Sequence, residues 1–142
     1  RAGRIIQAGT AQLLYHEPAD LFVARLFSQI NEIPVTVENG AVATPFGTFP
    51  APDHGEGDKV VLCVRQRAVW VYPSDHDDTM LLGRIVSTRF LGDLVLVSIA
   101  LDGLNQPLTS LVRGDRAPSV GDDVRVKVDP GGIMIFSRDE DA

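Results

Sequence analysis

A 16-residue pattern occurs twice in this chain, and it constrains the fold more than any other feature of the sequence. The first copy reads GDKVVLCVRQRAVWVY at residues 57–72, and the second reads GDDVRVKVDPGGIMIF at residues 121–136. In both copies apolar residues occupy alternate positions, which is typical of a strand with one buried face. Each copy therefore predicts a hairpin of two strands, and the repeat predicts two similar β units of about 64 residues. A unit of that size buries a thin core alone, so two units that pack together, with or without exchanging strands, are more stable.

The sequence from Ile33 onward shows the same period-two alternation over several further segments. Asn39-Gly40 lies between two of them and predicts a tight hairpin turn, because both turn positions need a positive φ. The segment FGTFPAPDHGEG, residues 46–57, is rich in Pro and Gly and predicts a loop without regular structure. Short strands among 13 glycines and nine prolines suit a barrel or a sandwich. Strands are expected at residues 59–65, 68–72, 83–90, 93–101, 107–113, 123–128 and 132–137.

The first 28 residues differ in character from the rest. They predict a short strand that ends at Gly9 and two short helices, at residues 11–16 and 19–28. Apolar residues give each helix an apolar face, and the segment itself offers little surface for these faces to pack against. Phe22 and Leu26 lie on the apolar face of the second helix and are expected to be interface residues. Either the two helices form a dimer, or they are the trailing edge of a preceding domain in a longer protein.

The first strand of the first copy is apolar on both faces. Val60, Leu62 and Val64 form one face, and Val61 and Cys63 form the other, whereas the second copy carries Arg and Lys on its second face. A strand that is apolar on both faces is covered on both faces. We therefore expect Val61 and Cys63 to lie against the other module or against a second chain.

Charge and cysteine content exclude several classes of protein. The net charge is −6, with 13 Lys and Arg against 19 Asp and Glu. The arginines are scattered, whereas a phosphate backbone requires a clustered basic face, so we expect no nucleic-acid partner. Cys63 is the single cysteine, so no intrachain disulfide can form, and a reducing cytoplasm fits this best. No apolar run reaches the roughly 18–20 residues of a membrane span.

The usual sequence motifs for catalysis are missing. The lysines, Lys59 and Lys127, follow no glycine-rich phosphate loop, and no G-x-S-x-G motif occurs. We therefore expect no catalytic residues and no cofactor in this chain. The best candidate for a binding site is the segment SDHDD, in which Asp75, His76 and Asp78 offer ligands to a cation such as Fe(III), Mn(II) or Ca(II). The alternative is a solvated acidic loop that joins the two modules.

Arginines on the expected strands form a second candidate site. Arg65, Arg89 or Arg113 would line a pocket between the two modules, where guanidinium groups suit small oxyanions. The alternative is that these side chains face solvent.

The opening segment GRIIQAGTAQLLYHEPADLFVARLF, residues 3–27, carries a family resemblance. It is similar to the end of the nucleotide-binding domain in the ATPase subunits of bacterial ABC importers, where the usual pattern is G-x-I-x-Q-x-G-T-P-x-E-L-Y-x-x-P-x-x-x-F-V-A-x-F. Ala11 replaces the usual proline, and Ser28 stands where a glycine often occurs. The matching residues are Gly3, Ile5, Gln7, Gly9, Thr10, Leu14, Tyr15, Pro18, Phe22, Val23, Ala24 and Phe27.

The remainder, residues 29–142, resembles the TOBE domain that follows in those subunits, a tandem OB-like barrel. The segment GRIVSTRFLGD, residues 83–93, is similar to the G-x-V-x-x-x-x-F-L-G strand and turn of that domain. The segment GDKVVLCVRQRAVWVYP, residues 57–73, takes the place of the family's G-x-x-V-x-L-x-x-R-P-E segment. Arg65 matches its arginine, but Gln66 and Arg67 replace its Pro-Glu pair. The resemblance implies a mainly β fold, with residues 1–28 as the trailing segment of a nucleotide-binding domain.

The function implied by this resemblance is that of a regulatory and dimer-forming domain. The parent subunit binds ATP and Mg, works with permease subunits, and lies at the cytoplasmic side of the inner membrane. This chain alone is not expected to hydrolyse ATP. The resemblance is greatest to ferric iron and polyamine importers, and we favour iron as the solute. The alternative is a free-standing module of the same barrel type that binds a small oxyanion or a metal.

Overall fold

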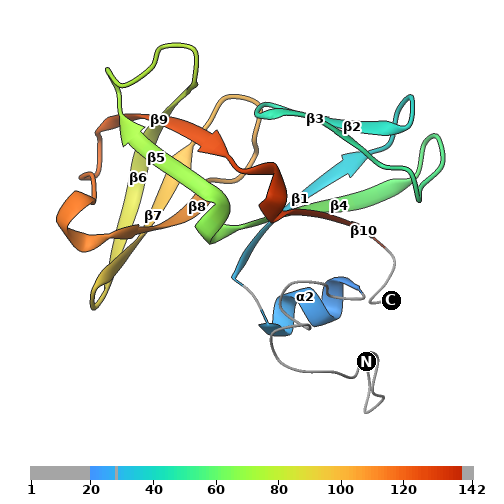
Figure 1. Ribbon diagram of the computed structural model, residues 1–142, viewed down its shortest axis with the longest axis horizontal. Coiled ribbons are helices and arrows are strands. Elements are labelled where there is room, and N and C mark those ends of the chain that lie inside the picture. Colours follow the sequence, from blue (N-terminus) through green and yellow to red (C-terminus); the bar gives the residue numbers. More distant parts are fainter. Residues whose placement is uncertain (1–19, 28, 139–142) are drawn as a thin grey trace. The chain divides into compact units, whose positions relative to one another are not determined.

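The computed structural model describes residues 20–27 and 29–138, and it is mainly β (Figure 1). The expected strand before Gly9 and the helix at residues 11–16 lie outside the described residues. The described α-helix is α2 (Leu21–Phe27), and three 3-10 turns are η1 (Gln66–Ala68), η2 (Gly114–Arg116) and η3 (Pro130–Gly132). The strands are β1 (Ile30–Thr36), β2 (Ala41–Thr44), β3 (Gly47–Pro50), β4 (Lys59–Arg65), β5 (Val69–Pro73), β6 (Leu81–Leu91), β7 (Leu94–Ala100), β8 (Leu108–Arg113), β9 (Asp123–Val128) and β10 (Ile133–Ser137).

All seven strands that were expected at numbered ranges form, from β4 to β10, with ends within two residues of the prediction. The Pro/Gly-rich segment at 46–57 was expected to be irregular, and this is wrong in part. Its beginning forms β3, which pairs with β2. Thr44 turns the chain between them, because its hydroxyl donates to the Gly47 carbonyl at 2.7 Å and accepts from the Phe46 N–H at 3.2 Å. Pro50 can end β3 because both strands of a two-stranded sheet are edge strands, where a missing N–H donor is tolerated.

The Asn39-Gly40 turn forms as predicted. Both residues have positive φ, 55° and 74°, and Glu38 and Ala41 exchange two backbone hydrogen bonds across the turn. The strands do not continue as a hairpin, however. β1 pairs with β4 in antiparallel register from Ile30↔Arg65 to Thr36↔Lys59, and β2 pairs with β3.

The two copies of the repeated segment have the same local structure, a strand, a three-residue 3-10 turn and a strand. They are β4–η1–β5 and β9–η3–β10. The prediction that each copy is a hairpin is wrong, because β4 lies between β1 and β10, while β5 pairs with β9. The copies thus exchange their second strands. A 3-10 turn sends the chain onward between the strands, whereas the commonest hairpins have a two-residue turn with positive φ.

This exchange divides the chain into two compact units. The first unit consists of residues 1–42, 49–65 and 134–142, and the second of residues 43–48 and 66–133. Each unit therefore contains the first strand of one copy and the second strand of the other, apart from the first residue of β10.

The second unit is built on a five-stranded sheet in the order β5-β9-β6-β7-β8. A bulge at Val86 interrupts the pairing of β6 with β7, between Ile85↔Ile99 and Ser87↔Ser98. Side chains of η1 and β8 join the two edges of the sheet and close the barrel. The Gln66 amide donates to the Thr109 hydroxyl at 2.9 Å, and a buried serine of β8 bonds to β5. The core of this unit includes Val69, Ile85, Val97, Ile99, Leu108, Val124 and Val126.

The first unit is built on the three-stranded sheet β1-β4-β10. Val61 and Cys63, on the second face of β4, are 6% and 0% exposed, and they pack with Leu21 of α2. Ile30, Met134 and Phe136 complete this cluster. The prediction that Val61 and Cys63 contact another module or chain is therefore corrected, because the chain's own helix covers this face.

An ion pair joins α2 to the neighbouring strand β1. Arg25 donates from Nε and Nη2 to the two carboxylate oxygens of Glu32, at 2.8 and 2.6 Å. This forked geometry fixes both side chains, although the pair is partly exposed and contributes about 1 kcal/mol or less. Phe22 is partly buried, and the side chain of Leu26 lies outside the described residues. None of the helices in the described part of the chain has the length and hydrophobicity to cross a bilayer.

Candidate functional site

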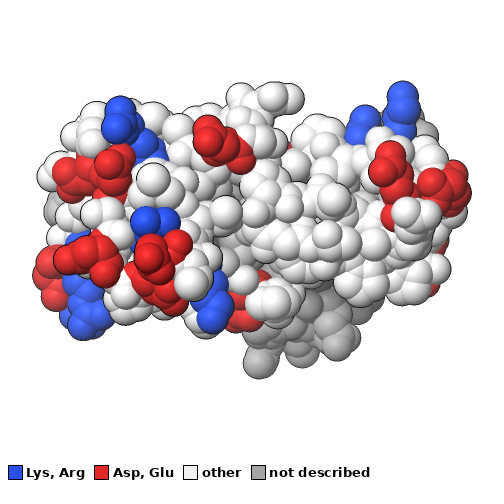
Figure 2. Space-filling model, turned by 90° about the horizontal axis from the view of Figure 1, so that it is seen from above, with Lys and Arg blue, Asp and Glu red and all other residues white. Residues whose placement is uncertain are grey.

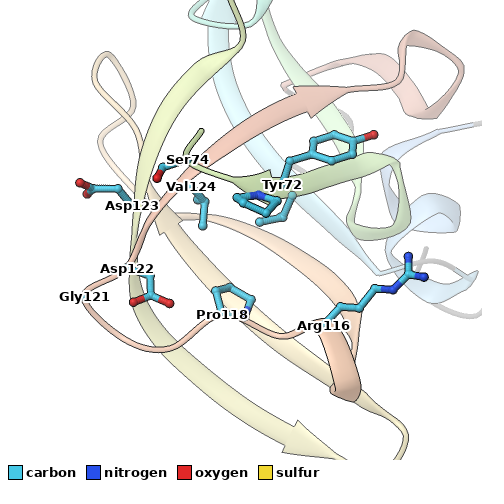
Figure 3. Close-up of a pocket in the computed structure, with 10 residues that line it drawn as sticks. Tyr72, Ser74, Arg116, Pro118, Gly121, Asp122, Asp123 and Val124 are labelled. Atoms are coloured by element: carbon cyan, nitrogen blue, oxygen red, sulfur yellow. The ribbon is translucent and has the colours of Figure 1, made fainter. Parts of the chain in front are cut away.

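A cavity of about 540 Å³ lies in the second unit, between the end of β5 and the segment that connects η2 to β9 (Figure 3). A volume of this size is typical of small-molecule sites. The end of β5 and the start of the next loop form one wall, and the connecting segment forms the other. The lining residues are Val71, Tyr72, Pro73, Ser74, Arg116, Pro118, Gly121, Asp122, Asp123 and Val124.

The first wall is held in place by Arg125 of β9. Its guanidinium donates to three main-chain carbonyls of the β5–β6 loop, those of Ser74, Asp78 and Met80, at 3.0, 3.5 and 3.0 Å. The loop therefore folds around a guanidinium group, which satisfies carbonyls that strand pairing leaves open. His76 in the same loop stacks on Tyr72, with ring centroids 4.4 Å apart and planes at 10°.

The second wall is held by two backbone hydrogen bonds to β6. The Gly121 N–H donates to the Ile85 carbonyl at 2.8 Å, and the Ile85 N–H donates to the Asp122 carbonyl at 2.9 Å. Gly121 has a φ of 93°, which a residue with a side chain rarely adopts. One carboxylate oxygen of Asp122, Oδ2, accepts from the Ser119 N–H at 2.9 Å and tightens the turn.

The charged groups of the cavity lie at its two ends. Asp122 and Asp123 are at one end and Arg116 is at the other (Figure 3). Asp123 is paired with Arg84 at 3.2 Å, but both side chains are largely exposed. Within the described residues, Arg116 has neither an ion pair nor a hydrogen bond from its side chain. The cavity thus keeps one unneutralised cationic end.

The acidic segment SDHDD does not form the predicted metal site of Asp75, His76 and Asp78. All three side chains are exposed, and His76 is stacked on Tyr72. Among the residues that the structure describes, no three His, Cys, Asp or Glu side chains gather closely enough to hold an ion. Arg125 organises the loop through main-chain oxygens, so the carboxylates point to solvent. This agrees with the alternative of a solvated acidic loop, but the loop lies within the second unit and does not join the two units as that alternative expected.

Asp77 has a local role in the same loop. Its Oδ1 accepts hydrogen bonds from the hydroxyl and the N–H of Thr79, at 2.7 and 2.9 Å. The hydroxyl bond, followed by the backbone bond, lowers the pKa of the Asp77 carboxyl below its ordinary value. This is the pattern of a short polar side chain that closes a turn.

The three arginines of the second predicted site have different surroundings. Arg65 is buried in the first unit and donates from Nη2 to the sulfur of Met134 at 3.6 Å. Arg89 is exposed on β6, and Arg113 at the end of β8 pairs with Asp115 at 3.5 Å. Arg113 lines a second cavity, of about 570 Å³, with Gly92, Asp93, Leu94, Gly114 and Asp115. A pocket that all three arginines share stays a prediction.

The cavity of Figure 3 was not predicted from the sequence. Its two charged ends come from a segment, residues 114–123, that carries no recognised motif. The available signal was the pair of turn residues before β9, Gly121 and Asp122, which begin the second copy of the repeat.

Acidic and basic side chains are interspersed on the face that Figure 2 shows, and on this face Lys and Arg form no continuous stripe. A track for a phosphate backbone would need such a stripe. This face of the described chain therefore gives no support for a nucleic-acid interface.

Comparison with known proteins shows one recognised domain and several relatives. Residues 73–136 match the TOBE domain. The chain is 34% identical over 137 residues to a Fe(3+) ions import ATP-binding protein, FbpC, of Streptomyces coelicolor, covering 96% of this chain and 38% of that protein. It is 33% identical over 112 residues to a spermidine/putrescine import ATP-binding protein, PotA, of Lawsonia intracellularis, covering 70% of this chain and 30% of that protein. The chain thus spans well under half the length of these relatives.

A solved structure shares the fold at low sequence identity. The cytoplasmic molybdate-binding protein ModG, with molybdate bound, superposes with a TM-score of 0.58 over 75% of this chain and 95% of ModG, at 15% identity. This supports the OB-type architecture of the two units. The chain therefore contains a TOBE domain at residues 73–136 and is homologous along most of its length to importer ATP-binding subunits.

Proposed function

We propose that this chain is the regulatory and dimer-forming region of the ATP-binding subunit of an ABC importer. The observation that carries the proposal is the alignment with FbpC, which covers 96% of this chain but 38% of the relative. A match of this kind fits one region of a larger subunit. The remaining part of that subunit would bind ATP and Mg and would hydrolyse ATP, while this chain contributes no catalytic residue.

The solute of the importer is proposed to be ferric iron. The first two relatives, both from Streptomyces, are Fe(3+) ions import proteins that align over 96% of this chain. Spermidine/putrescine import proteins align over 70–95% of it, at 28–33% identity. A polyamine is therefore the competing solute.

The partners follow from the same proposal. The parent subunit would lie at the cytoplasmic face of the inner membrane and contact permease subunits. The chain would contact its counterpart in a second subunit, with Phe22 and Leu26 of α2 at the interface. The apolar side chain of Phe22 supports this role, because it is only partly buried while Leu21 of the same helix packs on β4.

Two measurements test this proposal. Light scattering on the purified chain should give a dimer, and the Phe22→Ser variant should shift it toward the monomer, whereas Gln29→Ser, an exposed position two residues after α2, should not. In the complete subunit, removal of the region that this chain represents should change the regulation of ATP hydrolysis and leave basal hydrolysis in place. The proposal would be contradicted if the truncated subunit lost its basal ATP hydrolysis completely, or if the purified chain were a monomer.

A second candidate function is a small-ligand binding module of the same barrel type. The cavity in the second unit favours it, because this cavity has the volume of a small-molecule site. Equilibrium dialysis of the chain with ferric iron, spermidine, molybdate and sulfate separates the two functions. Saturable binding of an oxyanion by a monomeric chain favours the module, and a dimer that binds none of these solutes favours the regulatory region.

A further inference from the structure

We infer that the cavity between β5 and the η2–β9 segment binds a small zwitterion whose two charges are separated, such as an ω-amino acid or a dipeptide. The inference uses only the second unit, so it does not depend on the proposed importer function. It rests on three properties of the cavity: its walls are fixed, its opposite ends carry opposite charge, and its middle is apolar.

The walls of the cavity are fixed before any ligand binds. Arg125 holds Ser74 by its carbonyl at 3.0 Å, and the stack with His76 sets the plane of the Tyr72 ring. On the other side, Gly121 and Asp122 are tied to Ile85 by a reciprocal pair of backbone bonds. A site that is already ordered loses little entropy on binding, so modest contacts suffice for measurable affinity.

The cationic end of the cavity is Arg116. Its guanidinium has no acidic partner among the described residues, whereas the neighbouring Arg113 is paired with Asp115. A planar guanidinium binds a carboxylate through two parallel hydrogen bonds. We assign the carboxylate of the ligand to Arg116.

The anionic end is Asp122. Its Oδ2 accepts from the Ser119 N–H, which leaves Oδ1 to accept from a ligand. Asp123 adjoins it and adds negative charge, although Arg84 offsets part of this. A ligand ammonium group at this end would be attracted, and a dianion such as molybdate would be repelled. Since the acidic and basic ends are opposite (Figure 3), one ligand can satisfy both only if its charges are separated.

The middle of the cavity suits an aliphatic chain. Pro118 and Val124 lie between the two charged ends (Figure 3), and Val71 and Pro73 also line the cavity. Val124 is buried in the core. Tyr72 and Ser74 also line the cavity, and each carries a hydroxyl group, which can donate a hydrogen bond. A volume of about 540 Å³ holds a linear six-carbon chain or a dipeptide with room for water.

The test compares four probes of similar size. ε-Aminocaproate has an ammonium and a carboxylate at opposite ends, its isomer norleucine has the two charges side by side, and caproate and hexylamine each carry one charge. Binding is followed by the shifts of backbone amide signals in NMR titrations of the whole chain. We expect saturable binding of ε-aminocaproate with shifts at residues 71–74 and 116–124. Each of the other three probes should bind with an affinity at least about tenfold lower.

Matched variants separate a built site from general surface charge. Arg116→Gln should weaken ε-aminocaproate about tenfold and remove its advantage over hexylamine, and Asp122→Asn should remove its advantage over caproate. Arg113→Gln, a neighbouring exposed arginine outside this cavity, should leave the affinity unchanged. Equal loss in Arg116→Gln and Arg113→Gln, equal binding of norleucine, tighter binding of molybdate, or no saturation by ε-aminocaproate would each overturn the inference.

Discussion

The hydroxyl of Ser110 in β8 donates a hydrogen bond to the main-chain carbonyl of Val69 in β5, with 2.5 Å between the two oxygens. Both residues are buried, at 0% and 2% exposure. β5 and β8 are the two edges of the five-stranded sheet, so this bond replaces a rung of the ladder where the barrel closes. A buried carbonyl without its donor carries the full cost of desolvation.

Ser110→Ala should therefore destabilise the chain by about 1–3 kcal/mol, because it leaves the Val69 carbonyl without this donor. The free energy of unfolding is measured by urea denaturation, with the fluorescence of Trp70 in β5 as the signal. Ser87→Ala is the matched control, because Ser87 is exposed on β6. If the two variants unfold at the same urea concentration, the bond does not hold the barrel closed.

Gly83→Ala should destabilise the second unit by about 1–3 kcal/mol through steric overlap. A Cβ built on Gly83 would lie 2.6 Å from the Ile99 Cγ2 and 2.9 Å from the Leu101 Cδ2, and both neighbours are buried. Gly57→Ala is the control for strain alone, since its φ is 81° and its Cβ would meet no atom within 4 Å. A Gly83→Ala variant as stable as wild type would show that β7 yields to the added methyl.

The strands of this fold could be predicted from local alternation, but their partners could not. Alternating apolar residues mark β9 because Val124, Val126 and Val128 are buried and Lys127 is exposed. The choice of partner depends on where the chain goes after η1 and η3, and a 3-10 turn has no strong sequence signal comparable to Asn39-Gly40. The exchange of strands between the two copies was for this reason left open by the sequence.

The candidate site was harder to predict than the fold. The sequence drew attention to acidic residues, whereas the structure uses Arg125 to order their loop through carbonyl oxygens. Contacts from a side chain to the main chain of a loop about 50 residues away leave no pattern in one sequence. Likewise, the apolar second face of β4 did predict a cover, but not that Leu21 supplies it.

Arg125→Lys should loosen the β5–β6 loop without unfolding the barrel. A lysine keeps the charge but cannot reach three carbonyls in the plane of a guanidinium. Hydrogen exchange of the amides at 76–80 should become faster, and the unfolding free energy should fall by about 1–2 kcal/mol. Lys127→Gln, which alters the other basic residue on the same face of β9, should leave these amides unchanged. Unaltered exchange in Arg125→Lys would mean that the loop is held by its own turns.

Cys63 should make stability depend on pH in the alkaline range. Burial, with a smaller effect of the Glu32 carboxylate, raises the pKa of this thiol from 9.0 to about 12, while Arg25 acts in the opposite direction. The unfolded thiol ionises above about pH 9 and the folded one does not, so the contribution is complete below that pH and is lost as the pH rises toward 12. Between about pH 8 and 11 the unfolding free energy of wild type should fall more steeply than that of Cys63→Ala. Parallel curves would show that the folded thiol ionises normally.

Leu21→Ala should expose Cys63 to thiol reagents, because Leu21 of α2 packs on Val61 and Cys63. In wild type the thiol is fully buried and its raised pKa disfavours the reactive thiolate, so labelling at neutral pH requires opening of the cover. Removing the leucine side chain costs about 2–4 kcal/mol, most of it in the docking of α2 rather than in the sheet. The labelling rate should then rise by at least tenfold, while the amide exchange of β4 stays slow.

Leu82→Ala is the matched control, since Leu82 is 54% exposed and lies in the second unit. In the contrary case, α2 and β4 of the Leu21→Ala variant open together, and the labelling rate and the exchange rate of the Leu62 amide rise by the same factor. That result would show that α2 is an integral part of the core and not a cover that can lift from it.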